Sequence, residues 1–175
     1  ILFFVMLIVT LLSCKQGTKE TAISVPFEKY TLPNGLTVIL NVDNSDPIAA
    51  VAILFHVGSS REVPGRTGFA HLFEHMMFQK SENVGEDQLF KMIQAAGGTL
   101  NGGTNQDNTS YYEVVPKNAL EMVFWLESDR MGYLENTVTK AAFINQQNVV
   151  QNEKRQNYDN RPYGYNRMLI AKNLY

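Results

Sequence analysis

Apolar residues in the first part of the chain form short runs of the kind found in β-strands. Residues 27–41 hold two such runs on either side of Pro-Asn-Gly at 33–35, and Asn-Gly is a strong signal for a hairpin turn. Residues 48–57 are apolar almost throughout, which predicts a strand covered on both faces. Two further strands are predicted near 99–104 and 110–115.

Helices are predicted where apolar residues recur at spacings of three and four. After a polar loop at 58–65, we expect them over residues 69–78, 89–96, 118–132 and 139–160. Thr67 and Asn118 are the predicted N-caps of the first and third helices, because their side-chain oxygens can accept hydrogen bonds from the first turn. Glycines at 97–98 and at Gly132 are predicted to end the second and third, and Pro162 disfavours helix just before it.

The order of these elements is strands, two helices, strands and two helices. Such an order predicts the α+β class, with helices packed on a mostly antiparallel sheet. The length of 175 residues suits one domain, and 45% apolar residues are enough to bury a core. We therefore expect a folded domain over residues 26–175.

The charge balance excludes one class of partner. The chain has 15 basic and 17 acidic side chains, a formal net charge of −2, and no basic run of five residues or more. Nucleic-acid binding draws most of its affinity from clustered positive charge. We therefore expect no nucleic-acid partner.

The first twelve residues are apolar except for Thr10. They are fewer than the ~20 residues that span a bilayer, and their number fits the apolar part of a secretory signal peptide. A buried core segment of the folded protein is the alternative interpretation. Because a starting methionine and a positively charged start are both missing, we interpret residues 1–13 as a signal peptide truncated at its N-terminus.

Cys14 is the only cysteine and follows Leu-Leu-Ser at 11–13. This sequence resembles the lipobox of bacterial lipoproteins, whose cysteine becomes the lipidated first residue of the mature chain. An incidental cysteine beside an ordinary cleavage site is the alternative. Residues 14–25 are polar after the cysteine and lack apolar periodicity, which favours a flexible tether. By the same resemblance, Lys15 after the cysteine indicates a lipid anchor in the outer membrane, facing the periplasm.

His71, Glu74 and His75 carry the candidate chemistry, as an H-x-x-E-H sequence in the first predicted helix. Residues four apart lie on one helical face, so both imidazoles can bind one ion. Zinc takes such nitrogen ligands, and a catalytic zinc site adds a third protein ligand and an open position. This spacing is that of the inverzincin zinc peptidases. A pair of structural histidines is the alternative, and His56, the third histidine, is interpreted as packed or capped.

Beyond this motif, the chain from Pro26 onward resembles the N-terminal part of the pitrilysin/insulinase family of zinc peptidases. The matching stretches are LPNGLTV (32–38), HVGSSRE (56–62), GFAHLFEHMMF (68–78), AAGGTLNGGT (95–104) and VVQNEKRQNYDNRPYG (149–164). Five stretches in the same order are far more specific than the five-residue motif alone.

The resemblance implies a ligand set of His71, His75 and Glu153 for one zinc ion, with Glu74 as general base. Glu153 lies 78 residues beyond His75, in the Asn-Glu-x-Arg-Gln context of the family's third ligand. Family members usually carry a second glutamate seven residues before that ligand, where this chain has Gln146. An amide there can still hydrogen-bond around the metal site but brings no charge. Changes of this kind typically cost roughly 10–100-fold in metal affinity or activity.

Residues 99–104 allow two interpretations. Locally, Asn101-Gly102 predicts a hairpin turn. By resemblance, Asn101, Gly102, Gly103 and Thr104 belong to an edge strand to which a peptide substrate adds as a further strand. Glycines permit close backbone approach, and this chain has Gly102 where the family more often has alanine.

The resemblance implies a zinc metalloendopeptidase that hydrolyses peptides in the bacterial envelope. Residues 26–175 would be the first half-domain of a metalloprotease clamshell, truncated at its C-terminus. A C-terminal peptidase domain, in the same chain or in a partner subunit, would help bind the substrate. A non-catalytic scaffold or partner subunit of the same family is the alternative, and Gln146 favours it. A zinc enzyme that acts on small molecules is a third class.

Overall fold

The computed structural model describes residues 24–174, which fall into two compact units divided after Asp46. In the first unit, β1 (Glu28–Thr31) pairs antiparallel with β2 (Thr37–Leu40), so that Glu28 lies opposite Leu40. Gly35 has a φ of 89° in the turn between them, a conformation that favours glycine. The predicted hairpin is therefore confirmed.

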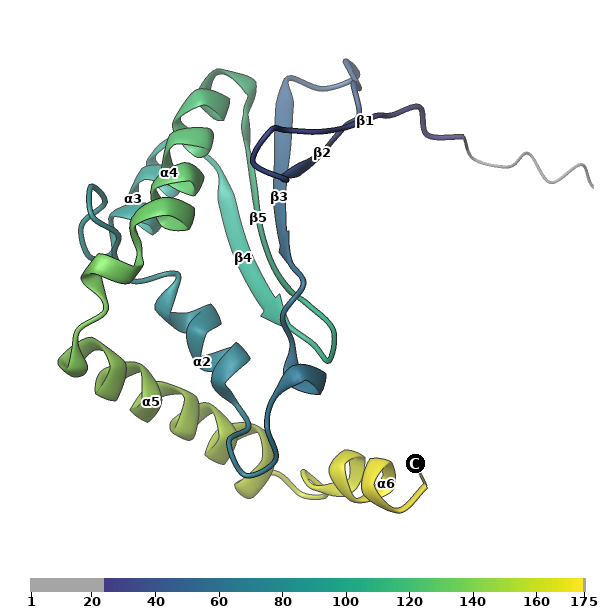
Figure 1. The fold of residues 1–175 in the computed structure, drawn as a ribbon, viewed down its shortest axis with the longest axis vertical. Helices are drawn as coiled ribbons and strands as arrows, with labels where there is room; N and C mark the ends of the chain where they lie inside the picture. The colour runs from purple at the N-terminus through teal and green to yellow at the C-terminus, as the bar shows by residue number, and fades with distance from the viewer. Residues whose placement is uncertain (1–23, 175) are drawn as a thin grey trace, which may run out of the picture. The chain divides into compact units, whose positions relative to one another are not determined.

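The second unit is built on a three-stranded antiparallel sheet (Figure 1). Its strands are β3 (Ile48–Phe55), β4 (Thr99–Thr104) and β5 (Thr109–Pro116), in the order β3-β5-β4. The central strand β5 pairs with β3 along its whole length and with β4 from Thr109 to Val114. β4 is therefore an edge strand, and its outer backbone groups are not paired within the described sheet.

Five α-helices surround or follow this sheet in the described residues: α2 (Phe69–Met76), α3 (Gln88–Ala95), α4 (Leu120–Tyr133), α5 (Lys140–Lys154) and α6 (Asn166–Leu174). Short 3₁₀ turns cover Ser59–Arg61, Lys117–Ala119 and Glu135–Thr137, and a π-helical turn, Arg155–Asp159, follows α5. Within residues 24–174, no helix combines the length and apolar character needed to cross a membrane. The α+β class predicted from the sequence is confirmed.

The core lies between α3, α4 and one face of the sheet. Its buried side chains are Val84, Leu89, Ile93, Val115, Ala119, Val123 and Leu126. Along β5, every second residue from Thr109 to Val115 is buried, as expected for a strand with one face on the core.

Four local predictions, one about β3 and three about helix ends, were wrong. β3 alternates between exposed and half-buried residues, with Leu54 exposed, because helices cover only one face of this antiparallel sheet within residues 47–174. The N-cap of α2 is Gly68 and not Thr67. Asn118 lies inside the 3₁₀ turn before α4, and that helix continues past Gly132 to Tyr133.

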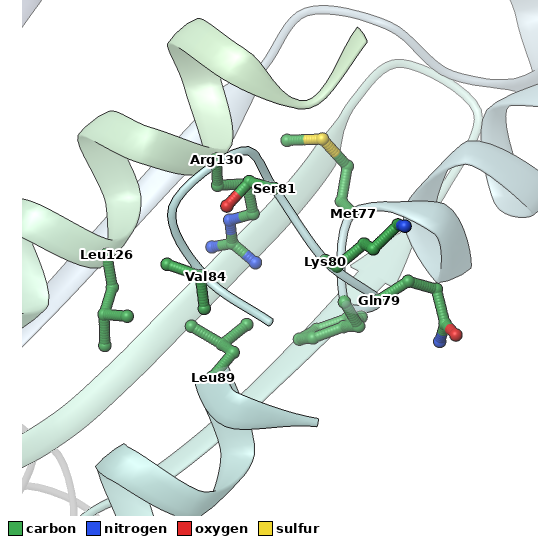
Figure 2. A pocket seen from close by; sticks show the side chains of 9 residues that line it. Met77, Gln79, Lys80, Ser81, Val84, Leu89, Leu126 and Arg130 are labelled. Carbon is green, nitrogen blue, oxygen red and sulfur yellow. The ribbon is translucent and has the colours of Figure 1, made fainter. Parts of the chain in front are cut away.

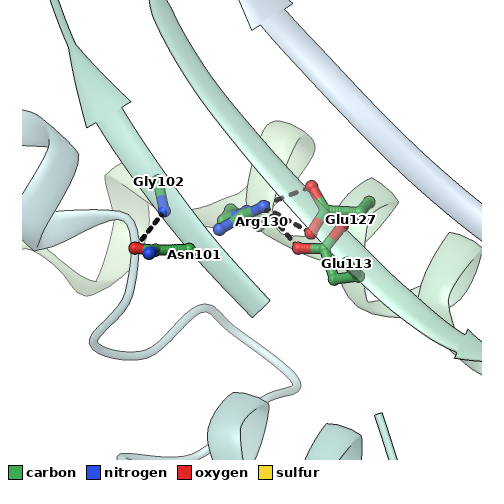
Figure 3. A network of polar contacts seen from close by, with 5 residues as sticks. All are labelled: Asn101, Gly102, Glu113, Glu127 and Arg130. Atoms are coloured by element: carbon green, nitrogen blue, oxygen red, sulfur yellow. Dashed lines mark hydrogen bonds and ion pairs between the residues drawn. The ribbon is translucent and has the colours of Figure 1, made fainter. Parts of the chain in front are cut away.

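A buried charged cluster of Glu113, Glu127 and Arg130 joins α4 to β5 (Figure 3). Arg130 donates from Nη2 to Glu113 Oε1 at 3.3 Å and also forms a close ion pair with Glu127. Its guanidinium lies 4.3 Å from the centroid of the Tyr111 ring and 5.6 Å from that of Phe78. Burial and the hydrogen bond with Glu127 raise the pKa of Glu113 to about 8, although Arg130 opposes this shift.

Arg130 also lines a cavity of ≈ 10 Å³ beside this cluster, about the size of one water molecule. Figure 2 shows its guanidinium among the apolar side chains of Val84, Leu89 and Leu126. Phe78 lines the same cavity. The ring of Phe78 therefore lies beside the buried cluster of Glu113, Glu127 and Arg130.

Candidate metal centre

The position of α2 is fixed by a carboxylate from the loop before it. Glu62 Oε2 accepts a hydrogen bond from the Gly68 amide at 2.8 Å, and Glu62 Oε1 accepts one from the Ala70 amide at 2.7 Å. Gly68 has a φ of 99°, a conformation that glycine adopts without strain. Glu62 thus serves as the side-chain cap of α2. Its negative charge at the N-terminus also interacts favourably with the helix dipole.

His71 and His75 extend from one face of α2 toward Glu153 on α5. Their ring centroids lie 4.9 Å apart, with the planes inclined at 83°. Glu153 Oε2 lies 3.7 Å from His71 Nε2 and 3.4 Å from His75 Nε2. One ligand atom from each of the three residues falls within 4.8 Å of the others.

This donor set fits a zinc ion in both chemistry and size. Zinc binds two imidazole nitrogens and a carboxylate oxygen at about 2.0–2.2 Å, in tetrahedral geometry. Two ligand atoms of such a tetrahedron lie roughly 3.3–3.6 Å apart. The separations of Glu153 Oε2 from the two imidazole nitrogens, 3.4 and 3.7 Å, are close to that edge length. The side chains of His71 and Glu153 are 42% and 40% exposed, so the site is open to solvent and substrate.

Glu74 lies beside the three converging residues but is not one of them. It is buried, and its Oε2 accepts a hydrogen bond at 2.5 Å from the hydroxyl of Thr104, the last residue of β4. On α2, Glu74 lies three residues after His71, a spacing that makes the two side chains neighbours, and it lines the same hollow as the imidazoles.

The four residues open into a hollow of ≈ 370 Å³. Its lining comprises His71, Glu74, His75, Phe78, Gln79, Phe90, Asn101 and Glu153. The rings of Phe78 and Phe90 lie 5.4 Å apart and give one wall an aromatic surface. Asn101 brings the edge strand β4 to the same hollow.

Residues 101–104 form a continuous part of β4, so the hairpin turn predicted at Asn101-Gly102 is wrong and the strand interpretation is correct. The turn lies at residues 105–108 instead. The Asn101 side chain accepts a hydrogen bond from the Gly102 amide at 2.8 Å (Figure 3). A Cβ atom on Gly102 would lie 2.9 Å from the Phe78 ring, whereas one on Gly103 would meet nothing within 4 Å.

Other residues singled out from the sequence lie as follows. Gln146 is buried on α5, two turns before Glu153 and therefore on the same side of that helix. His56 Nε2 lies 2.6 Å from Arg61 Nη2, outside the converging group. Cys14 lies outside the described residues, as does the predicted signal peptide.

Two contributions to the site were missed from the sequence. Glu62 was named only as part of HVGSSRE, with no role, because the amides that donate to its carboxylate lie six and eight residues ahead, whereas a capping side chain normally lies next to the helix. The hydrogen bond between Thr104 and Glu74 joins residues 30 positions apart, which no local pattern encodes.

Known proteins resemble this chain over most of its length. The sequence model of the insulinase family (peptidase family M16) matches residues 37–172. The zinc protease PqqE of Helicobacter pylori is 32% identical over 138 residues, which cover 78% of this chain and 31% of that protein. YmxG of Bacillus subtilis, named an uncharacterized zinc protease, is 24% identical over 148 residues, or 85% of this chain and 36% of that protein.

Solved structures share the fold. The crystal structure of a protease from Helicobacter pylori aligns with a TM-score of 0.76 and 31% identity, over 81% of this chain and 34% of that one. Pitrilysin aligns with a TM-score of 0.69 over 78% of this chain and 14% of its own, and at 24% identity this likeness concerns the fold alone. The chain spans about a third of the length of the Helicobacter pylori proteins. The match over residues 37–172, on this shared fold, shows that the chain belongs to the insulinase family of peptidases.

Proposed function

We propose that this chain is the catalytic part of a zinc metalloendopeptidase. The observation that carries the proposal is the convergence of His71, His75 and Glu153, with the carboxylate of Glu74 beside them in the same hollow. Three protein ligands with an open side are the arrangement of catalytic zinc sites, whereas structural sites are closed by four. The names of the relatives, zinc proteases, support the same metal.

The four residues divide the chemistry between them. His71, His75 and Glu153 would hold zinc, which supplies Lewis acidity, polarising the scissile carbonyl and lowering the pKa of the attacking water. Glu74 takes the proton from that water and returns it to the leaving amine.

The edge strand supports a peptide as substrate. Among the described residues, nothing pairs with the outer side of β4, and an extended peptide can add there as a further strand. Asn101 lines the hollow, and Gly102 and Gly103 leave the strand without bulky side chains next to it. Such backbone pairing would place one bond of the peptide at the proposed metal site. A small-molecule substrate would have no use for an edge strand of this kind.

The chain spans about a third of the length of the two Helicobacter pylori proteins. We propose a C-terminal peptidase domain, in the same chain or in a partner subunit, that closes over the substrate. We also propose a bacterial envelope location, with a lipid on Cys14 as the membrane anchor. The apolar stretch before Cys14 supports this location.

The test combines zinc analysis and peptide cleavage on the full-length protein. We expect about one zinc ion per protein chain and cleavage of unstructured peptides. Removal of the metal should abolish this cleavage. Glu74→Gln should keep the zinc but lower kcat at least ~100-fold, the low end of general acid–base contributions. Near-normal turnover of this variant with full zinc content would show that another group activates the water.

A non-catalytic family member is the second candidate, because Gln146 replaces the usual glutamate of the family beside the ligands. Zinc bound in full, with no cleavage of any peptide by the complete protein, would favour this function. Absence of zinc binding at His71 and His75 would contradict the proposed peptidase function.

A further inference from the structure

The contact between Thr104 and Glu74 joins the edge strand to the proposed general base. Thr104 is half-buried at the end of β4, and its hydroxyl lies 2.5 Å from Glu74 Oε2. Glu74 is itself buried on α2, where hydrogen bonds to a carboxylate are stronger than in water. This bond therefore restrains the carboxylate that faces the metal ligands.

A second hydroxyl lies beside the first on the neighbouring strand. Thr109 is buried opposite Thr104 in the register of β4 and β5, and their hydroxyl oxygens lie 3.2 Å apart. The Thr109 hydroxyl also lies 2.9 Å from the carbonyl oxygen of Val57, to which it can donate. Thr104 thus belongs to a polar group anchored to two strands and the loop that follows β3.

The loop before α2 holds the same end of β4 in place. The amides of Ser59 and Ser60 donate to the carbonyl oxygens of Asn105 and Gln106, at 3.0 and 2.9 Å, in the turn just after Thr104. Gly58 permits this approach, since a Cβ atom there would lie 2.5 Å from the Asn105 oxygen. The loop then continues to Glu62, the cap of α2. The helix that carries Glu74 and the end of β4 are therefore joined by two separate routes.

We propose that Thr104 is the positioning residue of Glu74. Its hydroxyl donates a hydrogen bond to one carboxylate oxygen of Glu74 and fixes the plane of that carboxylate. The other oxygen is thereby directed to the attacking water. This inference rests on the proposed peptidase function and gives Thr104 a role distinct from substrate binding. The side chain acts on the base, while the strand backbone remains free for a peptide.

The first test compares Thr104→Val, which removes the hydroxyl at nearly constant shape, with Thr104→Ser, which keeps it. Both are made in the full-length protein. Thr104→Val should lower kcat by roughly 10–100-fold, the range expected for one hydrogen bond to a charged group. KM and zinc content should stay close to wild type, and Thr104→Ser should recover most of kcat. Thr37→Val makes the same change at an exposed position of β2 and should leave kcat unchanged.

Two results would overturn the inference. An unchanged kcat in Thr104→Val would show that the hydroxyl does not act on the base. A raised KM with an unchanged kcat would assign Thr104 to substrate binding alone. If the wild-type protein cleaves no peptide, the proposed function fails, and a measurement without turnover then decides the inference.

That measurement is a double-mutant cycle on metal-free protein, with Thr104→Val, Glu74→Ala and the combination followed by thermal unfolding. If the hydroxyl bonds to Glu74, the lowering of Tm by Thr104→Val should shrink markedly once Glu74 is alanine. Equal Tm shifts in both backgrounds would show that the two side chains are not coupled, and would overturn the inference whatever the enzyme does.

Discussion

Gln146 is a buried amide two helical turns before a proposed zinc ligand. Seven residues bring a side chain back to nearly the same side of a helix, and α5 packs against α2, the helix of the two histidines. A neutral group at this place can orient a ligand by hydrogen bonding but cannot add to the negative charge around the metal.

We therefore predict that Gln146→Glu raises zinc affinity or turnover by up to about 10–100-fold, the range of groups that orient metal ligands. Gln146→Leu should lower both. Zinc affinity is measured by competition with a chelator, and turnover with a peptide substrate. Gln151→Glu adds the same charge at an exposed position of α5 and serves as the control. If all three variants equal wild type, Gln146 has no part in the site.

Glu113 makes stability depend on pH. In the folded chain its pKa is about 8, raised first by burial and then by Glu127, against 4.5 for an ordinary glutamate. Between these values the folded chain holds a proton that the unfolded chain releases. The stability that Glu113 contributes is therefore complete below about pH 4.5 and is lost as pH rises through about 8.

Glu113→Gln mimics the protonated form and should remove this part of the pH dependence. We expect the Tm of the full-length wild type to fall relative to that of the variant as pH increases from 4.5 to 8. Glu121→Gln, exposed on α4, is the control and should follow wild type. Parallel Tm curves for wild type and Glu113→Gln would mean that Glu113 is ionised throughout this range.

At the scale of residues, only those site residues whose common position follows from local helix geometry could be predicted from the sequence alone. His71, Glu74 and His75 follow from spacing on one helix, because helical geometry fixes their common face. Glu153 was identified by family resemblance alone, since its approach to the imidazoles depends on how α5 packs against α2. The pairing of Thr104 with Glu74 depends on that same tertiary structure.

At the scale of elements, the pattern of apolar and polar residues predicted all five strands and the bodies of α2 to α5. The interpretation of Asn101-Gly102 as a turn was wrong, because pairing with β5 continues β4 through these residues. The pattern also missed α6 (Asn166–Leu174), whose large apolar residues are mostly exposed and show no amphipathic pattern.

Glu62 matters at the scale of an element because it caps α2, the helix that carries the proposed zinc ligands His71 and His75. Glu62→Ala leaves the Gly68 and Ala70 amides without their acceptor, and losing a side-chain cap costs about 1 kcal/mol, with a range of ~0.5–2. We predict a lower Tm and weaker zinc binding, both partly restored in Glu62→Gln, which retains an acceptor. Unfolding in saturating zinc and in chelator separates the two effects. A loss of Tm with unchanged zinc affinity would limit Glu62 to stability.

At the scale of the whole molecule, the lipid-anchor hypothesis makes a prediction about location. The native full-length protein should fractionate with membranes, and Cys14→Ser should shift it to the soluble fraction. Acyl chains stabilise membrane binding by about 0.8 kcal/mol per buried CH₂, so more than one chain anchors firmly. A wild-type protein found wholly in the soluble fraction would instead indicate an ordinary signal peptide.

The wide separation of the three converging residues along the chain has a consequence for how the protein is made. During synthesis the two histidines leave the ribosome together, whereas Glu153 follows 78 residues after His75. At about 5–20 residues per second, that interval lasts roughly 4–16 s. The nascent chain can pair β3 and β5 during this time, but only two of the three donors are present. The proposed zinc ion would therefore gain its third ligand only when α5 docks on α2, late in the synthesis of this chain.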